Sequence, residues 1–404
     1  MSMIAMAVDP PPHADAQSHP TVKCLSPPGR SSSSETATAR SSAETRDAPP
    51  APVMWCPLVR TGAGSARVIG SAPMVRTTPP RPLDITALFP ELREHSITAT
   101  RLHPRPGAPT VTDSSVGGPL LWPADEVWPV CDDAGAHEPW NLTTPAALHR
   151  RREILAIADA RESLPGGDFL TAEERAELDA ADALDLDDLI EDPIPLVPVA
   201  QLYRRDVPDY AGPDGTDLLQ VLWCPVDHSD RHYSPRVFLY WRDSSAVGVG
   251  PLLEAPPEPP VISDMYLPVP CVVHPEQVRE YQYADLLPDD LRERLDEWDD
   301  DEDESRAHYQ SDLSLAPGWK VGGYANWSLT DPYPMNCAAC GTTMTLIFTV
   351  DSGDWNGMHC SWRPSEENPT ASPDTVGVQI GRGYSLYTFR CPESFDHPPA
   401  TAMQ

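Results

Sequence analysis

The cysteines and histidine near the end of the sequence carry its clearest chemical pattern. Cys337 and Cys340 are separated by two residues, a spacing that lets two thiolates of one turn reach a single ion. Further along, an expected strand at Tyr384–Arg390 is followed by another cysteine and a histidine. A structural zinc ion takes four such ligands in a tetrahedron. The zinc site predicted by this pattern consists of Cys337, Cys340, Cys391 and His397.

Two other interpretations of the Cys-x-x-Cys pair stay open. A redox-active pair usually opens a helix in a βαβ unit, whereas here a glycine and an expected strand at Met344–Val350 follow. The pair can also be two free thiols on a turn, because one Cys-x-x-Cys is only half of a zinc signature.

The same segment belongs to an order of features that occurs twice. Val-Gly-Gly-x-x-x-Trp ends once at Trp122 and once at Trp327. Each copy is followed by a cysteine, two expected strands and a Cys-Pro…Asp-His segment, which ends at His228 or at His397. Paired glycines permit a tight turn, and tryptophan supplies a large apolar anchor. The shared order predicts an internal duplication in which the two tryptophans occupy equivalent places.

A second metal site is expected in the first copy on the strength of this repeat. It has no Cys-x-x-Cys, so its spacing supports a metal less strongly than the spacing of the later set. Its members by position in the repeat are Cys131, His137, Cys224 and His228.

The charge of the chain limits the partners that it can bind. Lys and Arg number 29 against 61 Asp and Glu, which gives a net charge of −32. Nucleic acids and anionic membranes attract proteins through Lys and Arg, so we expect neither as a partner. A basic protein partner fits this charge, although the same charge can serve solubility alone.

The sequence shows no segment that would direct it to or through a membrane. Met1–Val8 has no basic region before its short apolar run, and no apolar stretch approaches the ~20 residues of a membrane helix. We therefore expect a cytoplasmic protein.

The order of composition along the chain predicts an α+β fold. Residues 1–80 are rich in Pro and Ser without hydrophobic periodicity, which predicts a disordered arm. Residues 81–274 are expected to form a first β-rich unit with a helical acidic insertion, with strands at Val197–Tyr203, Leu218–Trp223 and Val237–Trp241. An acidic helical connector at residues 275–312 and a second β-rich unit at residues 313–404 complete the prediction.

This order of motifs resembles the YwqG-like family, also called DUF1963, and more distantly programmed cell death protein 2 and its relatives. The residues that carry the resemblance are Val116–Pro119 with Trp122-Pro123, Val199–Leu202, Gly322-Gly323 with Trp327, and Cys337–Gly341. It covers roughly residues 110–397 and implies duplicated α+β units with protein-binding or chaperone-like roles. The chain departs from the family pattern where a second Cys-x-x-Cys is replaced by Cys391…His397, which weakens the zinc assignment.

Two classes of function follow from these features. The first is a binding or chaperone-like module that presents loops bearing Trp122 and Trp327, with an acidic surface, to a basic protein. The two tryptophans can instead be core residues with no ligand. The second class is a zinc- or carboxylate-dependent enzyme. The sequence contains no phosphate-binding loop, no Gly-x-Ser-x-Gly and no His-Glu-x-x-His motif, and no catalytic residue is predicted from it.

A gel-shift experiment tests the exclusion of nucleic acids. We expect no retardation of duplex DNA or RNA by the purified chain at physiological ionic strength, because the net charge of −32 repels phosphates. A retarded band whose intensity falls as salt is added would contradict the prediction.

Overall fold

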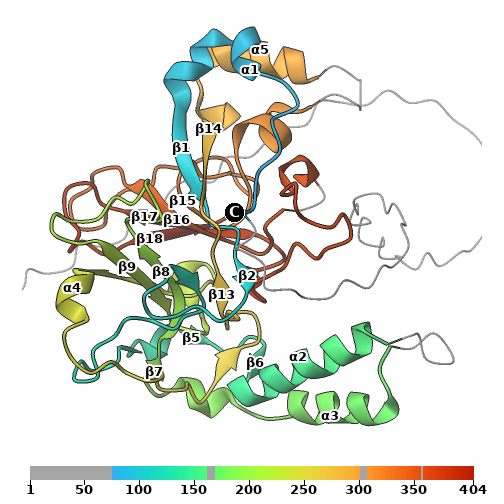
Figure 1. The fold of residues 1–404 in the computed structure, drawn as a ribbon, viewed down its shortest axis with the longest axis vertical. Helices are drawn as coiled ribbons and strands as arrows, with labels where there is room; N and C mark the ends of the chain where they lie inside the picture. The colour runs from blue at the N-terminus through green and yellow to red at the C-terminus, as the bar shows by residue number, and fades with distance from the viewer. Residues whose placement is uncertain (1–74, 162–168, 301–306, 356–357) are drawn as a thin grey trace, which may run out of the picture. The chain divides into compact units, whose positions relative to one another are not determined.

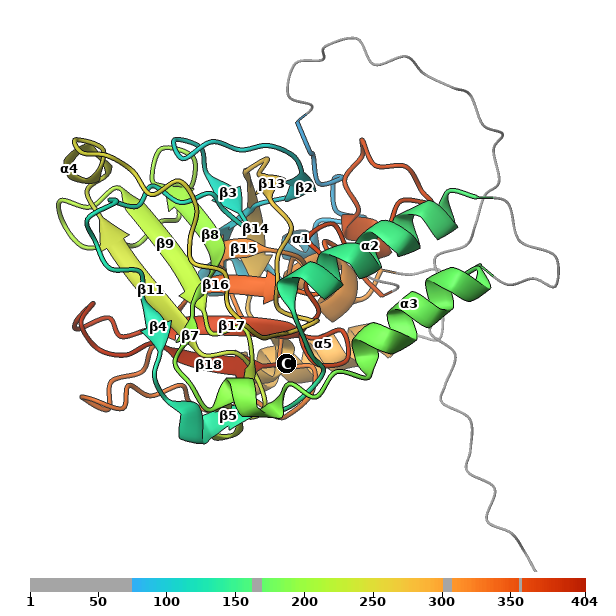
Figure 2. The same ribbon diagram turned by 90° about the horizontal axis from the view of Figure 1, so that it is seen from below.

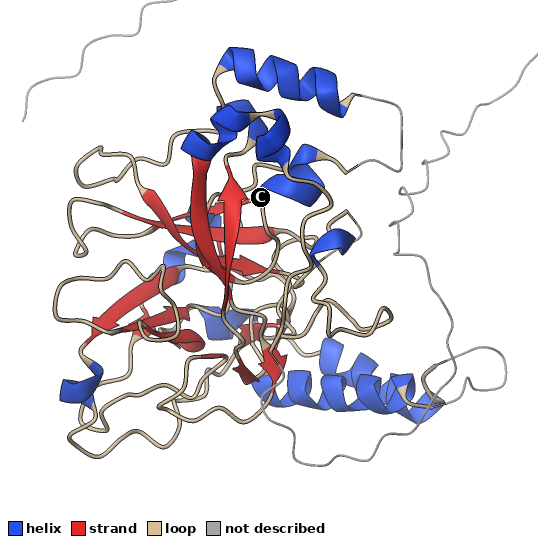
Figure 3. Cartoon of the chain, turned by 45° about the horizontal axis from the view of Figure 1, so that its top comes forward, coloured by secondary structure: helices blue, strands red, loops and turns tan. Residues whose placement is uncertain are grey.

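Runs of β-branched and aromatic residues form most of the ordered framework. The computed structural model describes residues 75–161, 169–300, 307–355 and 358–404. Most of their strands gather into two six-stranded antiparallel sheets, the other six form three two-stranded ladders, and the longer helices lie outside the sheets (Figures 1 and 3). The predicted α+β class is confirmed.

The α-helices and strands of the described residues have the following bounds. The helices are α1 (Ile85–Leu88), α2 (Pro145–Asp159), α3 (Ala172–Asp182), α4 (Ser244–Val247) and α5 (Asp289–Asp299). The strands are β1 (Ser96–Arg101), β2 (Arg105–Pro106), β3 (Ser115–Val116), β4 (Val130–Cys131), β5 (His137–Glu138), β6 (Leu142–Thr143), β7 (Ile194–Pro195), β8 (Val197–Tyr203), β9 (Leu218–Trp223), β10 (Asp227–His228), β11 (Val237–Arg242), β12 (Ile262–Ser263), β13 (Cys271–Val272), β14 (Glu276–Tyr281), β15 (Lys320–Gly322), β16 (Thr345–Asp351), β17 (Ser385–Arg390) and β18 (Ala400–Met403). Short 3₁₀ and π turns, such as Pro90–His95 and Tyr309–Ser314, join them.

The first sheet has the strand order β11-β9-β8-β3-β13-β2. Strand β9, next to the edge strand β11, reads Leu-Leu-Gln-Val-Leu-Trp and is buried along its whole length, as expected of a strand covered on both faces. The predicted strands at Val197–Tyr203 and Leu218–Trp223 are confirmed, and the one predicted at Val237–Trp241 extends by one residue.

The second sheet has the order β14-β1-β15-β16-β17-β18. The strands predicted at Met344–Val350 and Tyr384–Arg390 are present within one residue of their predicted ends. The helical connector predicted at residues 275–312 is wrong in its first part, where β14 pairs with β1, and the one α-helix among its described residues is α5. The polar sequence of β14 resembles a helix, but pairing with β1 in the folded chain overrides that local tendency.

The two sheets share one sequence of strands. In each, a two- or three-residue strand at the Val-Gly-Gly motif is followed by two long strands, β8 and β9 or β16 and β17. The first long strand shows a register irregularity in both sheets, between Pro198 and Ala200 and between Leu346 and Phe348. A cysteine follows the second long strand in each sheet. These correspondences support the internal duplication, which stays a prediction.

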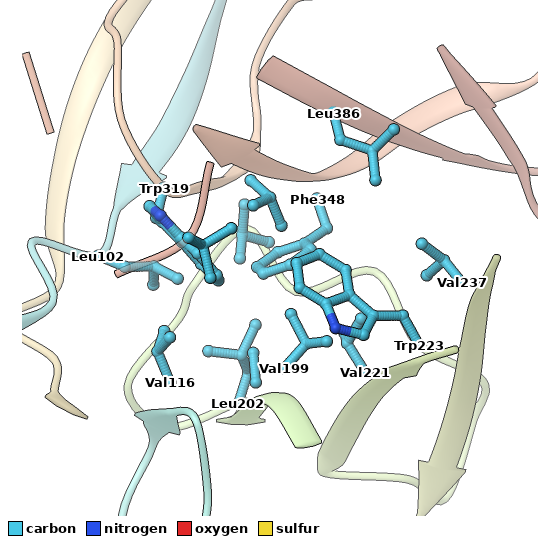
Figure 4. Close-up of a cluster of buried hydrophobic side chains, with 14 of the residues drawn as sticks. Leu102, Val116, Val199, Leu202, Val221, Trp223, Val237, Trp319, Phe348 and Leu386 are labelled. Carbon is cyan, nitrogen blue, oxygen red and sulfur yellow. The ribbon is translucent and has the colours of Figure 1, made fainter. Parts of the chain in front are cut away.

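An apolar core lies between the two sheets (Figure 4). Trp223 and Val237 come from the first sheet, and Phe348 and Leu386 come from the second, all within one buried cluster. On the outer side of each sheet lies a smaller cluster, one containing Trp122 and the other Trp327. The fold therefore has a shared central core and one outer core for each Val-Gly-Gly segment.

The sheets do not divide the chain at the predicted boundaries. Strand β1 lies in the range predicted for the first unit, and β14 lies in the predicted connector, yet both belong to the second sheet. The described residues all fall within one compact unit. In the second sheet β1 lies between β14 and β15. The second sheet therefore takes strands from both sides, along the sequence, of the segment that forms most of the first sheet.

The predicted disordered arm falls mostly on residues 1–74, which lie outside the described residues. Its last part is described and is bonded to the folded unit. Thr78 donates its backbone N–H and its hydroxyl to the Glu276 carboxylate, at 2.8 and 2.5 Å. The folded part therefore begins before the predicted boundary at residue 80, because Thr78 already belongs to it.

All four glycines of the two Val-Gly-Gly motifs have positive φ angles, between 70° and 83°. At Gly117 (φ 75°) an added Cβ would lie 2.5 Å from the Val269 carbonyl oxygen.

We expect Gly117→Ala to lower the free energy of unfolding by at least about 2 kcal/mol, through backbone strain and this contact. Gly250→Ala, where a Cβ meets nothing within 4 Å, is the control and should change it by less than about 0.5 kcal/mol. Urea unfolding measures both, and equal effects would contradict the expectation.

Candidate metal centres

The first Cys/His cluster is assembled from four separate segments around the outer core of the first sheet. Cys131 ends β4, which pairs with β7, and Cys224 follows β9, with its N–H donating to the Arg236 carbonyl at 3.0 Å. His137 and His228 lie directly opposite each other in the short ladder of β5 and β10. We refer to Cys131, His137, Cys224 and His228 as centre 1.

The four ligand atoms of centre 1 lie within 4.8 Å of one another. Cys131 Sγ is 3.3 Å from His137 Nε2 and 3.4 Å from His228 Nε2. Cys224 Sγ is 3.5 Å from His137 Nε2. Zn–S and Zn–N bonds of usual length at tetrahedral angles place S and N about 3.6 Å apart. The cluster therefore has the spacing at which its four atoms can share one ion.

The other nitrogen of each imidazole in centre 1 is held by the backbone. His137 Nδ1 lies 2.8 Å from the Ile190 carbonyl oxygen, and His228 Nδ1 lies 3.1 Å from that of Val226. Because a carbonyl only accepts, each Nδ1 carries the proton and each Nε2 points its lone pair at the sulfurs. This is the usual support of a metal-ligating histidine.

Burial and mutual contact shift the pKa values of the two thiols of centre 1 in opposite directions. The Cys224 thiol lowers the pKa of Cys131 well below its usual range, helped by the two imidazoles. Burial raises the pKa of Cys224 well above its usual value. Contacts with Cys131 and with the Ile190 carbonyl raise the pKa of His137, although burial opposes them. Two thiols and two imidazoles gathered in one buried cluster form a ligand set that suits a soft or borderline cation.

The second cluster, centre 2, consists of Cys337, Cys340, Cys391 and His397. Cys337 and Cys340 lie in a tight turn, where Gly341 donates to the Cys337 carbonyl at 2.8 Å with a φ of 75°. Cys391 follows β17, and His397 lies in the segment that leads into β18. Pairing of β16 with β17 therefore brings the two halves of the set together.

The atoms of centre 2 are also within 4.8 Å of one another. His397 Nδ1 lies 3.3 Å from Cys391 Sγ and 3.4 Å from Cys337 Sγ, and the Sγ atoms of Cys340 and Cys391 are 3.5 Å apart. The imidazole here faces the sulfurs through Nδ1, whereas both imidazoles of centre 1 use Nε2. The structure thus contains two Cys/His clusters that can hold a metal ion.

The two centres differ in exposure to solvent. All four residues of centre 1 are buried, whereas Cys340 of centre 2 is exposed and His397 is partly exposed. Hydrogen bonds from Thr342 lower the pKa of Cys340 to about 6, and burial raises the pKa of Cys391. The sixth free thiol of the described residues, Cys271, lies apart from both centres in the central core.

The two motif tryptophans are not on the surface. Trp122 is 1% exposed and packs against Trp128 at a centroid distance of 4.8 Å, and Trp327 is 6% exposed and packs against Tyr333 at the same distance. The prediction that their loops present them to a partner does not agree with this burial. Both act as anchors of the outer cores because the strands beneath them leave a large apolar space to fill.

A buried ionic network that sequence reasoning missed surrounds Asp354. His103 Nδ1 and an Arg105 guanidinium nitrogen lie 3.1 and 2.9 Å from its Oδ2, and Arg101 donates to its backbone carbonyl at 2.9 Å. Although burial opposes it, His103 and the two arginines hold the pKa of Asp354 well below its usual range. No local signal marks these residues, because they come from sequence positions about 250 apart. The network fastens the segment around Asp354 to the end of β1.

The chain matches no protein-family model and no curated protein. The resemblance to the YwqG-like family therefore rests on the motifs of the sequence alone. Among the described residues, no helix is long and apolar enough to cross a membrane.

Exposure predicts the order in which the clustered thiols react in the chelator-treated, metal-free chain. Cys340 should be alkylated first because it is exposed and largely a thiolate at pH 7, and its rate should fall as the pH drops through about 6. The buried Cys224 should be the slowest, since burial keeps it protonated. Short iodoacetamide pulses read by peptide mass spectrometry measure both rates. Urea-unfolded protein is the control, and equal rates in the folded chain would contradict the expectation.

Proposed function

We propose that the chain is a protein-binding module held together by two structural zinc ions. The observation that carries the proposal is that each cluster supplies four protein ligands at mutual distances suited to one tetrahedral ion. Cysteine and histidine are the ligands that favour zinc over magnesium or calcium. Each ion would join segments that are distant in sequence, as Cys131 and Cys224 are in centre 1.

A catalytic role for the same ions has less support. Catalytic zinc sites keep one position for water or substrate and use three protein ligands. Both sets here have four, and centre 1 is buried throughout. The enzyme alternative would require one ligand to leave, and no observation favours that.

The surface that best supports a basic protein partner is the α2–α3 hairpin, which projects beside the sheets (Figure 2). Helix α3 has no buried residue. Between Thr171 and Asp192 the chain carries ten carboxylates and one arginine. Exposed apolar side chains accompany them, namely Leu155, Ile157, Phe169 and Leu184. Acidic groups beside exposed apolar groups suit a basic amphipathic partner, since charge steers the encounter and apolar contact stabilises it.

Helix α3 is attached to the rest of the unit mainly through α2. Arg150 pairs with Glu177 at 2.7 Å, and Arg151 pairs with Asp182. Helix α2 in turn is fixed by Arg152, which donates to the carbonyls of Leu267 and Gly377 at 2.7 and 2.8 Å. The α2–α3 hairpin is thus an acidic projection that is held to the rest of the unit through α2. Trp122 and Trp327 do not belong to it.

Metal analysis tests the zinc part of the proposal. We expect the purified protein to carry about two zinc ions per chain and His228→Gln to carry about one, with a melting midpoint lowered by about 5 °C or more. His232→Gln is the matched control, because His232 is exposed and lies outside both clusters.

Loss of zinc from the His232 variant, or wild-type protein without zinc and with unchanged stability, would contradict the assignment. Cys340→Ser tests centre 2 in the same way and should leave centre 1 loaded, since no residue belongs to both clusters.

Affinity capture followed by mass spectrometry tests the binding part. We expect the tagged chain to retain basic proteins that salt releases. Replacing the exposed Asp179, Asp185, Asp188 and Glu191 by their amides should abolish their retention. The control makes the same charge change on α5, at Asp289, Asp290, Glu293 and Glu297. Equal retention by both variants would contradict a role for the acidic segment Thr171–Asp192, which comprises α3 and the residues that follow it.

A further inference from the structure

A groove of about 420 Å³ lies between the outer strands of the two sheets. One wall is β11, the edge of the first sheet, and the other is formed by the segment Ser394–Pro399 with Thr401 of β18, the edge of the second sheet. Both strands appear at the left of Figure 2. Trp241 and Phe395 touch across the groove, with ring centroids 5.2 Å apart. The groove is separate from the α2–α3 hairpin, since no residue of α2 or α3 lines it.

Strand β11 offers unpaired backbone groups to this groove. Among the described strands it pairs only with β9, and the Cys224 N–H donates to the Arg236 carbonyl, so the backbone of Arg236 faces β9. Alternation along an antiparallel strand then turns the N–H and C=O of Leu239 and Trp241 away from β9. Five consecutive residues, Val237–Trp241, line the groove, as expected of a strand that faces it with its edge. Such an edge can pair with an added extended segment.

Three arginines line the same groove in a chain that is strongly acidic. They are Arg231, Arg236 and Arg390. The Nε of each is buried and has no hydrogen-bond partner among the described residues. Arg231 and Arg236 nevertheless form ion pairs with Asp230, and Arg236 also pairs with Asp133 at 2.6 Å.

Arg390 differs from the other two because no described carboxylate pairs with it. It donates to the Cys391 carbonyl at 2.9 Å and lies over the Phe395 ring at 4.5 Å. A partly buried guanidinium with unused donors in a fixed orientation is complementary to a carboxylate. Asp396 also lines the groove, and its negative charge would repel a dense acidic cluster. The anion that fits is therefore a single carboxylate placed at Arg390.

We propose that this groove binds an extended, carboxylate-bearing peptide segment of another protein. The segment pairs its backbone with the outer edge of β11, and a carboxylate accepts hydrogen bonds from Arg390. Its alternate apolar side chains pack against Leu239 and Trp241, which border the central core. The site is distinct from the surface proposed above for a basic partner. It borders both metal centres, through Arg236 beside Cys224 and through His397 in its wall.

A peptide titration tests the proposal on the full-length, metal-loaded chain. The probes are fluorescein-labelled hexapeptides of alternating valine and threonine in which one central threonine is replaced by glutamate or by lysine, matched to the six residues of β11. Fluorescence anisotropy should show saturable binding of the glutamate peptide and none of the lysine peptide. Arg390→Gln should weaken the binding about tenfold or more, because a charge-assisted hydrogen bond is lost. Arg382→Gln, at an exposed arginine outside the groove, is the control for charge and should not weaken it.

A second pair of variants tests the backbone pairing. Leu239→Pro removes an outward N–H without removing a ladder bond to β9 and should weaken binding about tenfold, whereas Leu239→Ala keeps the N–H and should weaken it less. Zinc content and circular dichroism show whether each variant is folded, and if the proline variant is not, Arg390→Gln decides. The proposal fails if the glutamate peptide does not bind, if the lysine peptide binds as well, or if a folded Arg390→Gln chain keeps full affinity. Loss of zinc with intact peptide binding would count against the proposed zinc role alone.

Discussion

Trp223 of β9 and Phe348 of β16 lie in one apolar cluster that fills the space between the two sheets. Burying the inner faces of both sheets against each other removes a large apolar area from water, which is the dominant favourable term in folding. The inner faces are thereby fixed, so the chemistry-bearing segments lie on the outer sides and at the strand ends. Both Cys/His clusters are found there, beside the smaller cores that contain Cys131 and Cys337.

Two buried ionic groups pair within the second sheet, one on β14 and one on β15. The Lys320 ammonium lies 2.6 Å from the Glu280 carboxylate, whose other oxygen accepts the Tyr324 N–H at 2.9 Å. Because an isolated charge is costly in such a place, the pair specifies that β14 and β15 flank β1 in one register. The Val-Gly-Gly turn that follows Lys320 needs its glycines because Gly323 approaches the same carboxylate. Charge pairing and turn geometry therefore act on one short segment.

The two clusters use one layout with different ligands. In each, a cysteine that follows the second long strand meets a nearby Asp-His histidine and a cysteine that follows the Val-Gly-Gly-x-x-x-Trp motif. The fourth position is His137 in centre 1 and Cys340 in centre 2. A set of two thiolates and two imidazoles is neutral around Zn²⁺, whereas three thiolates and one imidazole leave one negative charge. The neutral set is the buried one and the charged set is partly exposed, as the cost of burying charge requires.

The sequence by itself determined the strands with continuous apolar runs, such as β9 and β16, because their local pattern and their buried environment agree. It also singled out all eight residues of the two clusters, since thiol and imidazole spacing is a local property and the repeat related one set to the other. Only the tertiary structure decided that β14 is a strand, that Trp122 and Trp327 are buried, and that edge strand β11 faces Arg390 across a groove. Each of these depends on which segments distant in sequence become neighbours, and periodicity and spacing within one segment carry no information about that.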